Sequence, residues 1–265
     1  MNSQPTRRRL LQIAGTGTLA GLAGCSRSGT SGSGESRSAT MRLRIENVAP
    51  TDYYPADAST GGGIWLTPGV YAVHTSGYPI VSDGEAASVG LEALAEAGRP
   101  TGFEGQSGLV DEVRDVGSVT AAESYTANAT VADPNDPTGE VPGAPPIAPG
   151  GAFEVTFEIE PVRWLSIASM VVPSNDVFIA PAQWIQIWPA DAAPIDTEIT
   201  DKLALWDAGT EPNGRPGFGP DQPPTQNASD QGADEDGVVR QLSAVDDGHD
   251  YPAVEELVQV TIAPV

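Results

Sequence analysis

The feature that most constrains this chain is a run of strict alternation at residues 153–159, FEVTFEI. Phe153, Val155, Phe157 and Ile159 alternate with glutamate and threonine. A period of two places the apolar side chains on one face of a β-strand and the polar side chains on the other. The apolar face must be covered by other parts of the chain, so the chain has to build a sheet with a buried face.

Other short apolar runs predict further strands of this kind. The 30 glycines and 24 prolines of the 265-residue chain separate these runs from one another. Only residues 88–98, SVGLEALAEAG, have apolar residues near helical spacing, with Glu92 and Glu96 on the other face and Gly98 as a stop. We therefore expect an all-β fold, an antiparallel β-sandwich with Greek-key-like connections and one short helix. The expected strands include residues 41–48, 64–66, 69–74, 153–159, 164–172, 184–188 and 257–262.

The N-terminal segment has the pattern of an export signal. Arg7 and Arg8 lie in the stretch TRRRLL, which matches a twin-arginine signal, and an apolar stretch rich in glycine and alanine follows at residues 13–23. This stretch is too short to span a bilayer as a stable helix. It ends in LAGC, which resembles a lipoprotein signal-peptidase box, and Cys25 would then accept the lipid. The alternative is a chance cysteine in a hydrophobic leader.

We therefore expect three parts in the chain. Residues 1–24 would form a twin-arginine lipoprotein signal peptide, and residues 25–40 a tether rich in serine and glycine. Residues 41–265 would form the folded domain. The mature protein would be extracytoplasmic and anchored to the outer face of the cell membrane by lipidated Cys25. Because Cys25 is the only cysteine, the chain can form no intrachain disulfide.

The charge of the chain limits its partners. The formal net charge is −23, and Lys202 is the only lysine. Removal of residues 1–24 takes away three arginines and no acids, which leaves −26. This pattern is typical of halophilic proteins, because high salt screens the self-repulsion of an acidic surface. The domain has no basic patch, so we expect no binding of nucleic acid.

Two acidic turns are candidates for a metal site. In WDAGTE, residues 206–211, Asp207 and Glu211 are four apart around a glycine, and PSND carries Asp176 after another apolar run. Carboxylates brought close together repel one another unless water, a hydrogen-bond donor or a cation lies between them. The residue types alone leave two interpretations open: these acids share a cation, or Asp176 caps a turn and the other two are solvated.

Three stretches resemble the spondin domain, the module found in F-spondin and in related secreted proteins of bacteria and archaea. They are LSIASMVVPSNDVF (165–178), LWDAGTE (205–211), and PGVYAVHTSG (68–77) with the segment that follows it. The resemblance spans about residues 41–265. It implies a β-sandwich with one bound calcium ion, whose ligands would be Asp176, Asp207 and Glu211 by position. The chain departs from the family pattern at Glu211, where aspartate is usual, and at Asn175, where proline is common. Glutamate can also bind calcium.

Other candidates have simpler interpretations. His74 lies two residues from Ser76, but no glycine-flanked nucleophile elbow follows, so we expect a histidine in the core or at its rim. The acids of residues 221–250 could hold a second calcium or could form a hydrated face. Asn128 and Asn227 begin glycosylation sequons. The five tryptophans lie in apolar runs and are expected mainly in the core.

The sequence thus predicts a non-enzymatic module with a structural calcium site, for binding or adhesion at the cell surface. Its ligand would be an extracellular or cell-surface protein or glycan, and its contact with the membrane would be through the lipid anchor alone. One alternative is a secreted hydrolase that uses a pair of carboxylates. Another is a purely structural component of the envelope. A deep pocket that holds further acids would favour the enzyme.

The lipid anchor can be tested at Cys25. Cys25→Ser removes the thiol that accepts the lipid, so the variant should be released to the medium or remain uncleaved. Cell fractionation and the mass of the mature protein distinguish these outcomes from anchoring. If the variant stays in the membrane fraction at the normal mature mass, the protein is not held there by a lipid on Cys25.

Overall fold

The computed structural model describes residues 37–125, 130–132, 146–228 and 230–265. The predicted signal peptide, Cys25 and most of the predicted tether lie outside the described residues. So do Asn128 and residues 133–145, a stretch with four prolines.

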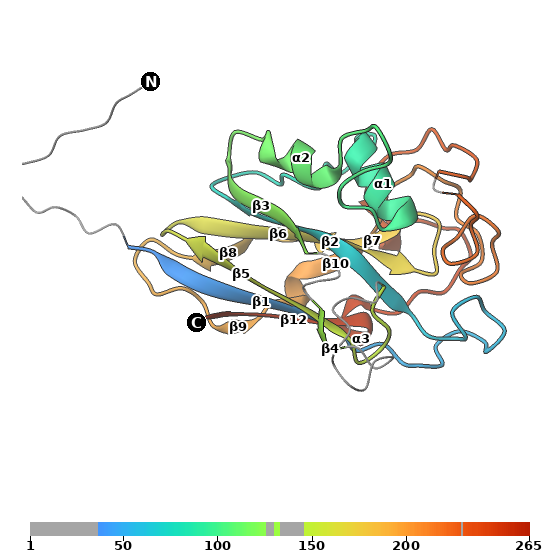
Figure 1. Ribbon diagram of the computed structural model, residues 1–265, viewed down its shortest axis with the longest axis horizontal. Coiled ribbons are helices and arrows are strands. Elements are labelled where there is room, and N and C mark those ends of the chain that lie inside the picture. The colour runs from blue at the N-terminus through green and yellow to red at the C-terminus, as the bar shows by residue number, and fades with distance from the viewer. Residues whose placement is uncertain (1–36, 126–129, 133–145, 229) are drawn as a thin grey trace, which may run out of the picture. The chain divides into compact units, whose positions relative to one another are not determined.

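Two antiparallel β-sheets pack face to face (Figure 1). The first sheet has the strand order β4-β5-β1-β12-β9, so that strands from both ends of the domain pair with each other. Its strands are β1 (Ala39–Asn47), β4 (Thr130–Ala132), β5 (Ala152–Ile159), β9 (Thr197–Glu198) and β12 (Val258–Pro264). The chain changes sheet six times along this order, after β1, β3, β5, β8, β9 and β11, in keeping with the predicted β-sandwich.

The second sheet has the order β11-β10-β7-β6-β2-β3, with β8 paired to β6. Its strands are β2 (Trp65–His74), β3 (Val119–Tyr125), β6 (Arg163–Val172), β7 (Val177–Pro181), β8 (Ile185–Trp188), β10 (Leu203–Asp207) and β11 (Arg240–Gln241). β6 is buried along nearly its whole length, as its continuous apolar run predicts.

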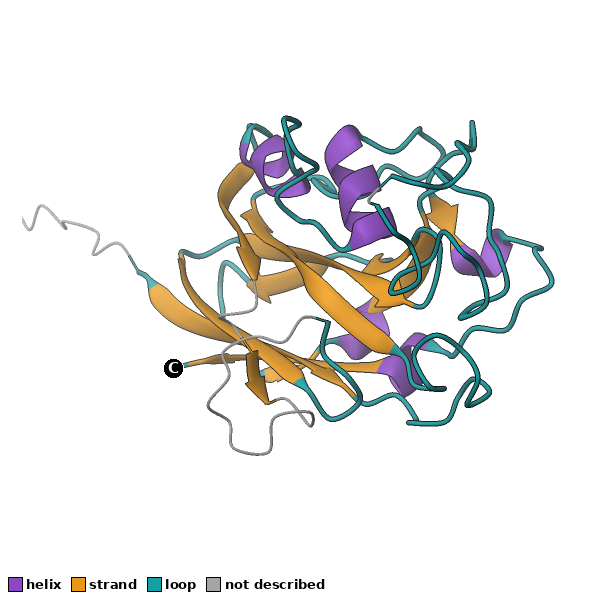
Figure 2. Ribbon diagram, turned by 45° about the vertical axis from the view of Figure 1, so that its right-hand side comes forward, coloured by secondary structure: helices purple, strands orange, loops and turns teal. Residues whose placement is uncertain are grey.

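Two helices cover the outer face of the second sheet, so the domain has three layers (Figures 1 and 2). They are α1 (Val89–Ala97) and α2 (Leu109–Arg114); the third helix, α3 (Val254–Leu257), leads into β12. One apolar cluster fills the space between the sheets, and a second lies between the second sheet and these helices. The second cluster explains why β6 and its neighbours are apolar on both faces.

The predicted helix is present, and it ends at Gly98 as expected. The hydroxyl of Ser88 accepts a hydrogen bond from the backbone N–H of Leu91, and Gly98 ends the helix in the left-handed conformation. α2 was not predicted, because six residues give too short a pattern to show helical spacing. The first strand begins at Ala39 instead of residue 41, since Ala39 and Thr40 pair with the end of β5.

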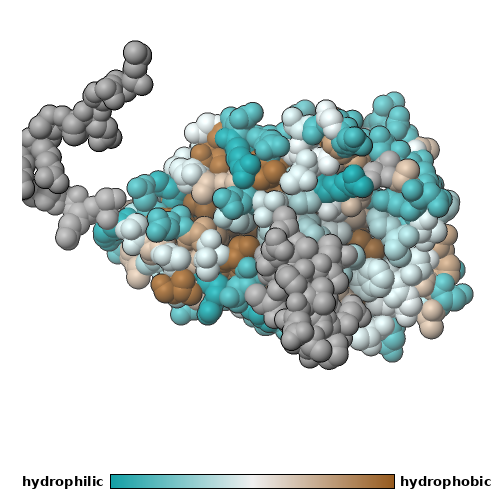
Figure 3. All heavy atoms as spheres, viewed as in Figure 1, coloured by the Kyte–Doolittle hydropathy of each residue, from teal (hydrophilic) through white to brown (hydrophobic). Residues whose placement is uncertain are grey.

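On the face seen in Figure 3, hydrophobic residues lie in separate small groups between hydrophilic ones. Within the described ranges, no helix combines the length and the apolar character that crossing a membrane requires.

Candidate metal centre

Strand pairing brings two of the predicted ligands to the same place. β7 and β10 are antiparallel neighbours, and Asp207, the last residue of β10, lies opposite Val177, the first residue of β7. Asp176 immediately precedes Val177, and its carbonyl accepts a hydrogen bond from the N–H of Ala208 at 3.2 Å. The two acidic turns therefore lie at one end of the second sheet.

The WDAGTE turn is held by the segment that leads into β11. Gly209 has φ +67°, and a Cβ at this position would lie 2.6 Å from the backbone nitrogen of Val238. Glycine is required at position 209 because of the positive φ and because a side chain would clash with the backbone of Val238. The N–H groups of Glu235 and Gly237 donate to the carbonyls of Thr210 (2.7 Å) and Gly209 (3.0 Å).

The carboxylate of Asp176 is completely buried and only half satisfied. Its Oδ2 accepts hydrogen bonds from the backbone N–H of Thr210 at 2.8 Å and of Glu211 at 3.3 Å, and from the Thr210 hydroxyl at 3.3 Å. Its Oδ1 has no hydrogen-bond partner among the described residues. Burial, with the nearby charge of Asp207, raises the pKa of Asp176 to about 7.

Asp207 is also completely buried, and one of its oxygens lacks a donor. Oδ2 accepts a hydrogen bond from the side-chain amide of Asn213. Oδ1 lies 3.5 Å from Nε of Arg240, close enough for attraction, but neither atom has a hydrogen-bond partner. Burial raises the pKa of Asp207 in spite of the opposing effects of Asn213 and Arg240.

Glu211, the third predicted ligand, is buried but has its carboxylate engaged elsewhere. Its Oε2 accepts from the amide of Asn175 at 3.0 Å, and its Oε1 accepts from the N–H of Gly232 at 3.0 Å. A Cβ on Gly232 would lie 2.1 Å from Oε1, so glycine permits this approach. Asn175 is itself held by Gln222, which donates to Asn175 Oδ1 at 2.8 Å.

The structure thus gathers the three predicted acids in one region. Their carboxylate oxygens, however, are not among those that all lie within 4.8 Å of one another. Within the described residues, a different group of acids meets that distance. The evidence that a cation could bind near Asp176 and Asp207 is instead the presence of side-chain oxygens that accept no hydrogen bond from the described residues. Asp176 Oδ1, Asp207 Oδ1 and Asn213 Oδ1 are all buried and unpartnered. Carboxylate and amide oxygens are the ligands that a hard cation such as calcium takes, so the donor set fits. Asn213 was not a predicted ligand.

The group that the structure does bring within this distance is Glu92, Glu96 and Asp230. One oxygen from each lies within 4.8 Å of the others, so this group could hold a metal ion. The sequence pattern placed Glu92 and Glu96 on the polar face of the helix. Glu96 is in fact only 3% exposed and is buried despite its position on that face. Burial raises its pKa to about 8, and the charges of Glu211, Glu92 and Asp230 add to this.

His74 lies apart from both acidic groups, at the end of β2 that pairs with Trp164. His74 is buried at the end of β2, and its Nε2 lies 3.0 Å from the hydroxyl of Ser166. Its Nδ1 lies 3.2 Å from the backbone carbonyl oxygen of Ser76. The contact with Ser76 is therefore made through the backbone and not through the hydroxyl group. His74 is therefore a core histidine with a lowered pKa caused by burial.

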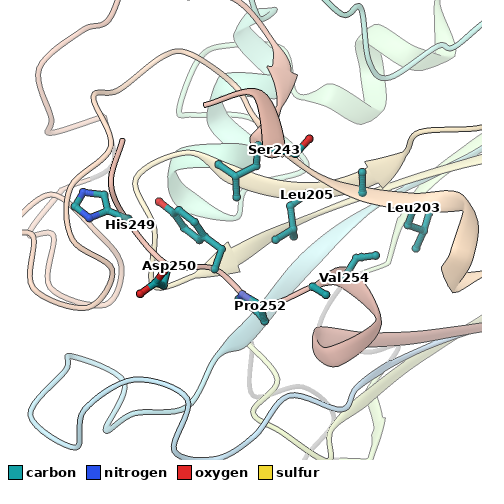
Figure 4. A pocket seen from close by; sticks show the side chains of 11 residues that line it. Leu203, Leu205, Ser243, His249, Asp250, Pro252 and Val254 are labelled. Atoms are coloured by element: carbon teal, nitrogen blue, oxygen red, sulfur yellow. The ribbon is translucent and has the colours of Figure 1, made fainter. Parts of the chain in front are cut away.

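A cavity of about 430 Å³ is lined by Ser243, His249 and Asp250 together with apolar residues (Figure 4). The His249 ring and the Ser243 side chain lie at different sides of this cavity and do not point toward each other. No hydrogen bond joins these three side chains within the described part of the chain. The arrangement therefore does not form a serine–histidine–acid constellation.

The tryptophans differ in burial more than expected. Trp188 and Trp206 are in the core, as predicted, whereas Trp184 is 46% exposed. The prediction was wrong for Trp184 because β8 begins one residue later, at Ile185. Trp184 contacts Tyr78, with ring centroids 4.8 Å apart, and Trp164 at 5.9 Å.

Comparisons with known proteins leave the family open: no family model matches the chain, and no curated protein matches it. The resemblance to the spondin domain stays a prediction based on the motifs at residues 165–178 and 205–211.

The raised pKa values of Glu96 and Asp176 predict how stability depends on pH in metal-free protein. Both groups keep their protons to a higher pH in the folded state than in the unfolded chain, where values near 4.5 and 3.8 apply. The folded state therefore binds more protons between about pH 5 and pH 8, and its stability should fall as pH rises through this range.

Thermal unfolding with chelator in 1 M salt measures this slope, because such salt screens the exposed charges. Glu96→Gln should flatten the slope by several degrees in melting temperature between pH 5 and pH 8. Glu104→Gln changes an exposed glutamate and should leave it unaltered. Equal slopes for Glu96→Gln and the wild type would contradict the assignment of Glu96 as a buried, protonated acid.

Proposed function

We propose that this protein is a surface-anchored binding module whose β-sandwich is stabilised by calcium. The anchor would be the lipid on Cys25, and the acidic surface would suit a salt-rich exterior. The domain would act by binding a cell-surface or extracellular partner and not by catalysis. The observation that carries the proposal is the buried pair Asp176 and Asp207, each with an oxygen that has no donor.

The calcium part of the proposal follows from electrostatics. Two buried carboxylates close enough to repel one another, as the effect of Asp207 on the pKa of Asp176 indicates, destabilise a fold unless an opposite charge compensates them. Among the described residues, Arg240 forms an ion pair with Asp207 but not with Asp176, and it is shared with Glu235, which lies 3.6 Å from it. A divalent cation would compensate both aspartates and would use the oxygens that the protein leaves unpaired. Calcium accepts carboxylate and amide oxygens in an irregular shell, whereas magnesium requires a tighter octahedral one.

Calcium should therefore raise the melting temperature of the wild type at constant ionic strength, and by more than magnesium does. Binding to the folded state alone adds about 2.7 kcal/mol at a hundredfold excess over Kd. In a domain of this size, that corresponds to roughly 5 to 10 °C. Asp207→Asn should abolish most of this increase. In the presence of chelator the same variant should be at least as stable as the wild type, since it removes a buried like charge.

Asp246→Asn is the matched control, because it makes the same chemical change at an exposed position. It should keep the full calcium response. The calcium site would be refuted if calcium and magnesium stabilise the wild type and Asp207→Asn equally.

The binding part of the proposal is supported by a surface cluster of aromatic rings, Tyr78, Trp164 and Trp184. Tyr78 is 39% exposed and Trp184 is 46% exposed, and their rings are in contact. Exposed aromatic residues that are already ordered by their neighbours lose little entropy on binding, and such residues are enriched at binding surfaces. A neutral glycan or a protein surface suits this cluster better than an anionic polymer, because the domain is strongly acidic.

Co-sedimentation of the mature domain with isolated cell envelopes tests this surface. Trp184→Ala together with Tyr78→Ala should reduce the bound fraction at least tenfold without loss of the folded state. Phe218→Ala removes another exposed aromatic ring, which stacks on Arg215 away from the cluster, and should bind as the wild type does. Unchanged binding by the double variant would show that the cluster is not the contact surface.

A further inference from the structure

We propose that Glu92, Glu96 and Asp230 form a second cation site, distinct from the one at Asp176 and Asp207, and that its ligand is a hard divalent cation of the size of calcium. The two glutamates are four residues apart on α1 and so lie on one face of the helix. Asp230 approaches them from the segment before β11. The site does not depend on the calcium site proposed above, and either could exist alone.

The distances suit one ion. A single oxygen from each of the three side chains lies within 4.8 Å of the others. Two oxygens on opposite sides of one calcium ion are about 4.6 to 5.2 Å apart, since each bond is about 2.3 to 2.6 Å. The three carboxylates can therefore bind one such ion without rearrangement of the backbone.

A second observation, independent of these distances, is a buried carboxylate oxygen of Glu96 without a hydrogen-bond donor among the described residues. Glu96 is only 3% exposed, and its Oε2 is buried and has no hydrogen-bond partner in the part of the chain that the structure describes. Within the described residues, no lysine, arginine or histidine forms an ion pair with Glu92, Glu96 or Asp230. A buried carboxylate without a partner is one of the most unfavourable groups in a protein interior, so a compensating charge is expected.

The position of Glu96 in the helix adds to the negative potential around its carboxylate. Glu96 lies in the last turn of α1, where the partial negative charge of the helix dipole is concentrated. No basic residue lies in that turn. The neighbouring carboxylates of Glu211 and Glu92 add further negative potential at the same place. A cation bound there would be attracted by the helix terminus as well as by its three ligands.

The two sites are adjacent through Thr210. Its backbone N–H donates to Asp176 Oδ2, and its hydroxyl lies beside Glu96, where it offsets part of the rise in pKa. An ion at Glu92, Glu96 and Asp230 would join α1 to the segment that carries Asp230. An ion at Asp176 and Asp207 would instead join β7 to β10. The second site thus fastens the helical layer to the loops at the same end of the sandwich.

Calcium binding to the chelator-stripped mature protein tests the inference by its stoichiometry. Equilibrium dialysis in 1 M sodium chloride limits weak binding to exposed acids. The wild type should bind two calcium ions, and Glu96→Gln should bind one. Asp230→Asn should weaken the same site at least tenfold, and because Asp230 is exposed this variant tests the site without a change in the core. Glu104→Gln is the control and should bind two.

The outcomes separate this site from the first. Asp207→Asn should bind one calcium, and Asp207→Asn with Glu96→Gln should bind none. One ion in the wild type that survives Glu96→Gln and Asp230→Asn but not Asp207→Asn would overturn the second site and leave the first. One ion that is lost in Glu96→Gln and retained in Asp207→Asn would support the second site and refute the first.

Discussion

The burial of carboxylates without matching cations is the constraint on which the functional end of this protein depends. Asp176 and Asp207 are both completely buried, and among the described residues the only basic side chain that forms an ion pair with either is the partly exposed Arg240. Backbone N–H groups satisfy one oxygen of Asp176, and Asn213 satisfies one of Asp207. The remaining oxygens have no donor, and this imbalance is the physical reason for assigning a cation to the region.

The same imbalance recurs on the neighbouring helix. Glu96 is buried against Glu92 and Asp230, and the charge of Glu211 acts on it from the WDAGTE turn. The loops between β10 and β11 therefore bring acids from three separate parts of the chain to one end of the sandwich. Without bound cations, repulsion among these acids would destabilise this end of the domain.

Much of the fold could be predicted because its signals are local. The alternation in β5, the continuous apolar run of β6 and the caps of α1 each appear within about ten residues. α2 and the exposure of Trp184 could not be predicted in the same way. α2 is only six residues long, and the side of the sheet on which Trp184 lies depends on the register of β8 against β6.

The candidate site was predictable in part. The residues of WDAGTE and PSND predicted two acidic turns, the resemblance to the spondin domain implied that they share a site, and the pairing of β7 with β10 places both turns together. The contributions of Asn213 and Asp230 depend on how long loops return to the sheet, which no local pattern encodes. Glu96 was expected on a polar face of the helix but is buried. Helical spacing separates the two faces of a helix, but it does not show which face a loop covers. The i, i+4 pair of glutamates on a helix whose last turn has no basic residue was the one available signal.

Metal analysis of the mature protein, purified without added calcium and separated from free ions by gel filtration, tests the central claim most directly. If cations compensate the buried carboxylates, the protein should retain at least one equivalent of calcium, and its removal by chelator should lower the melting temperature. A protein that contains no divalent metal and melts at the same temperature with chelator and with calcium would contradict the account.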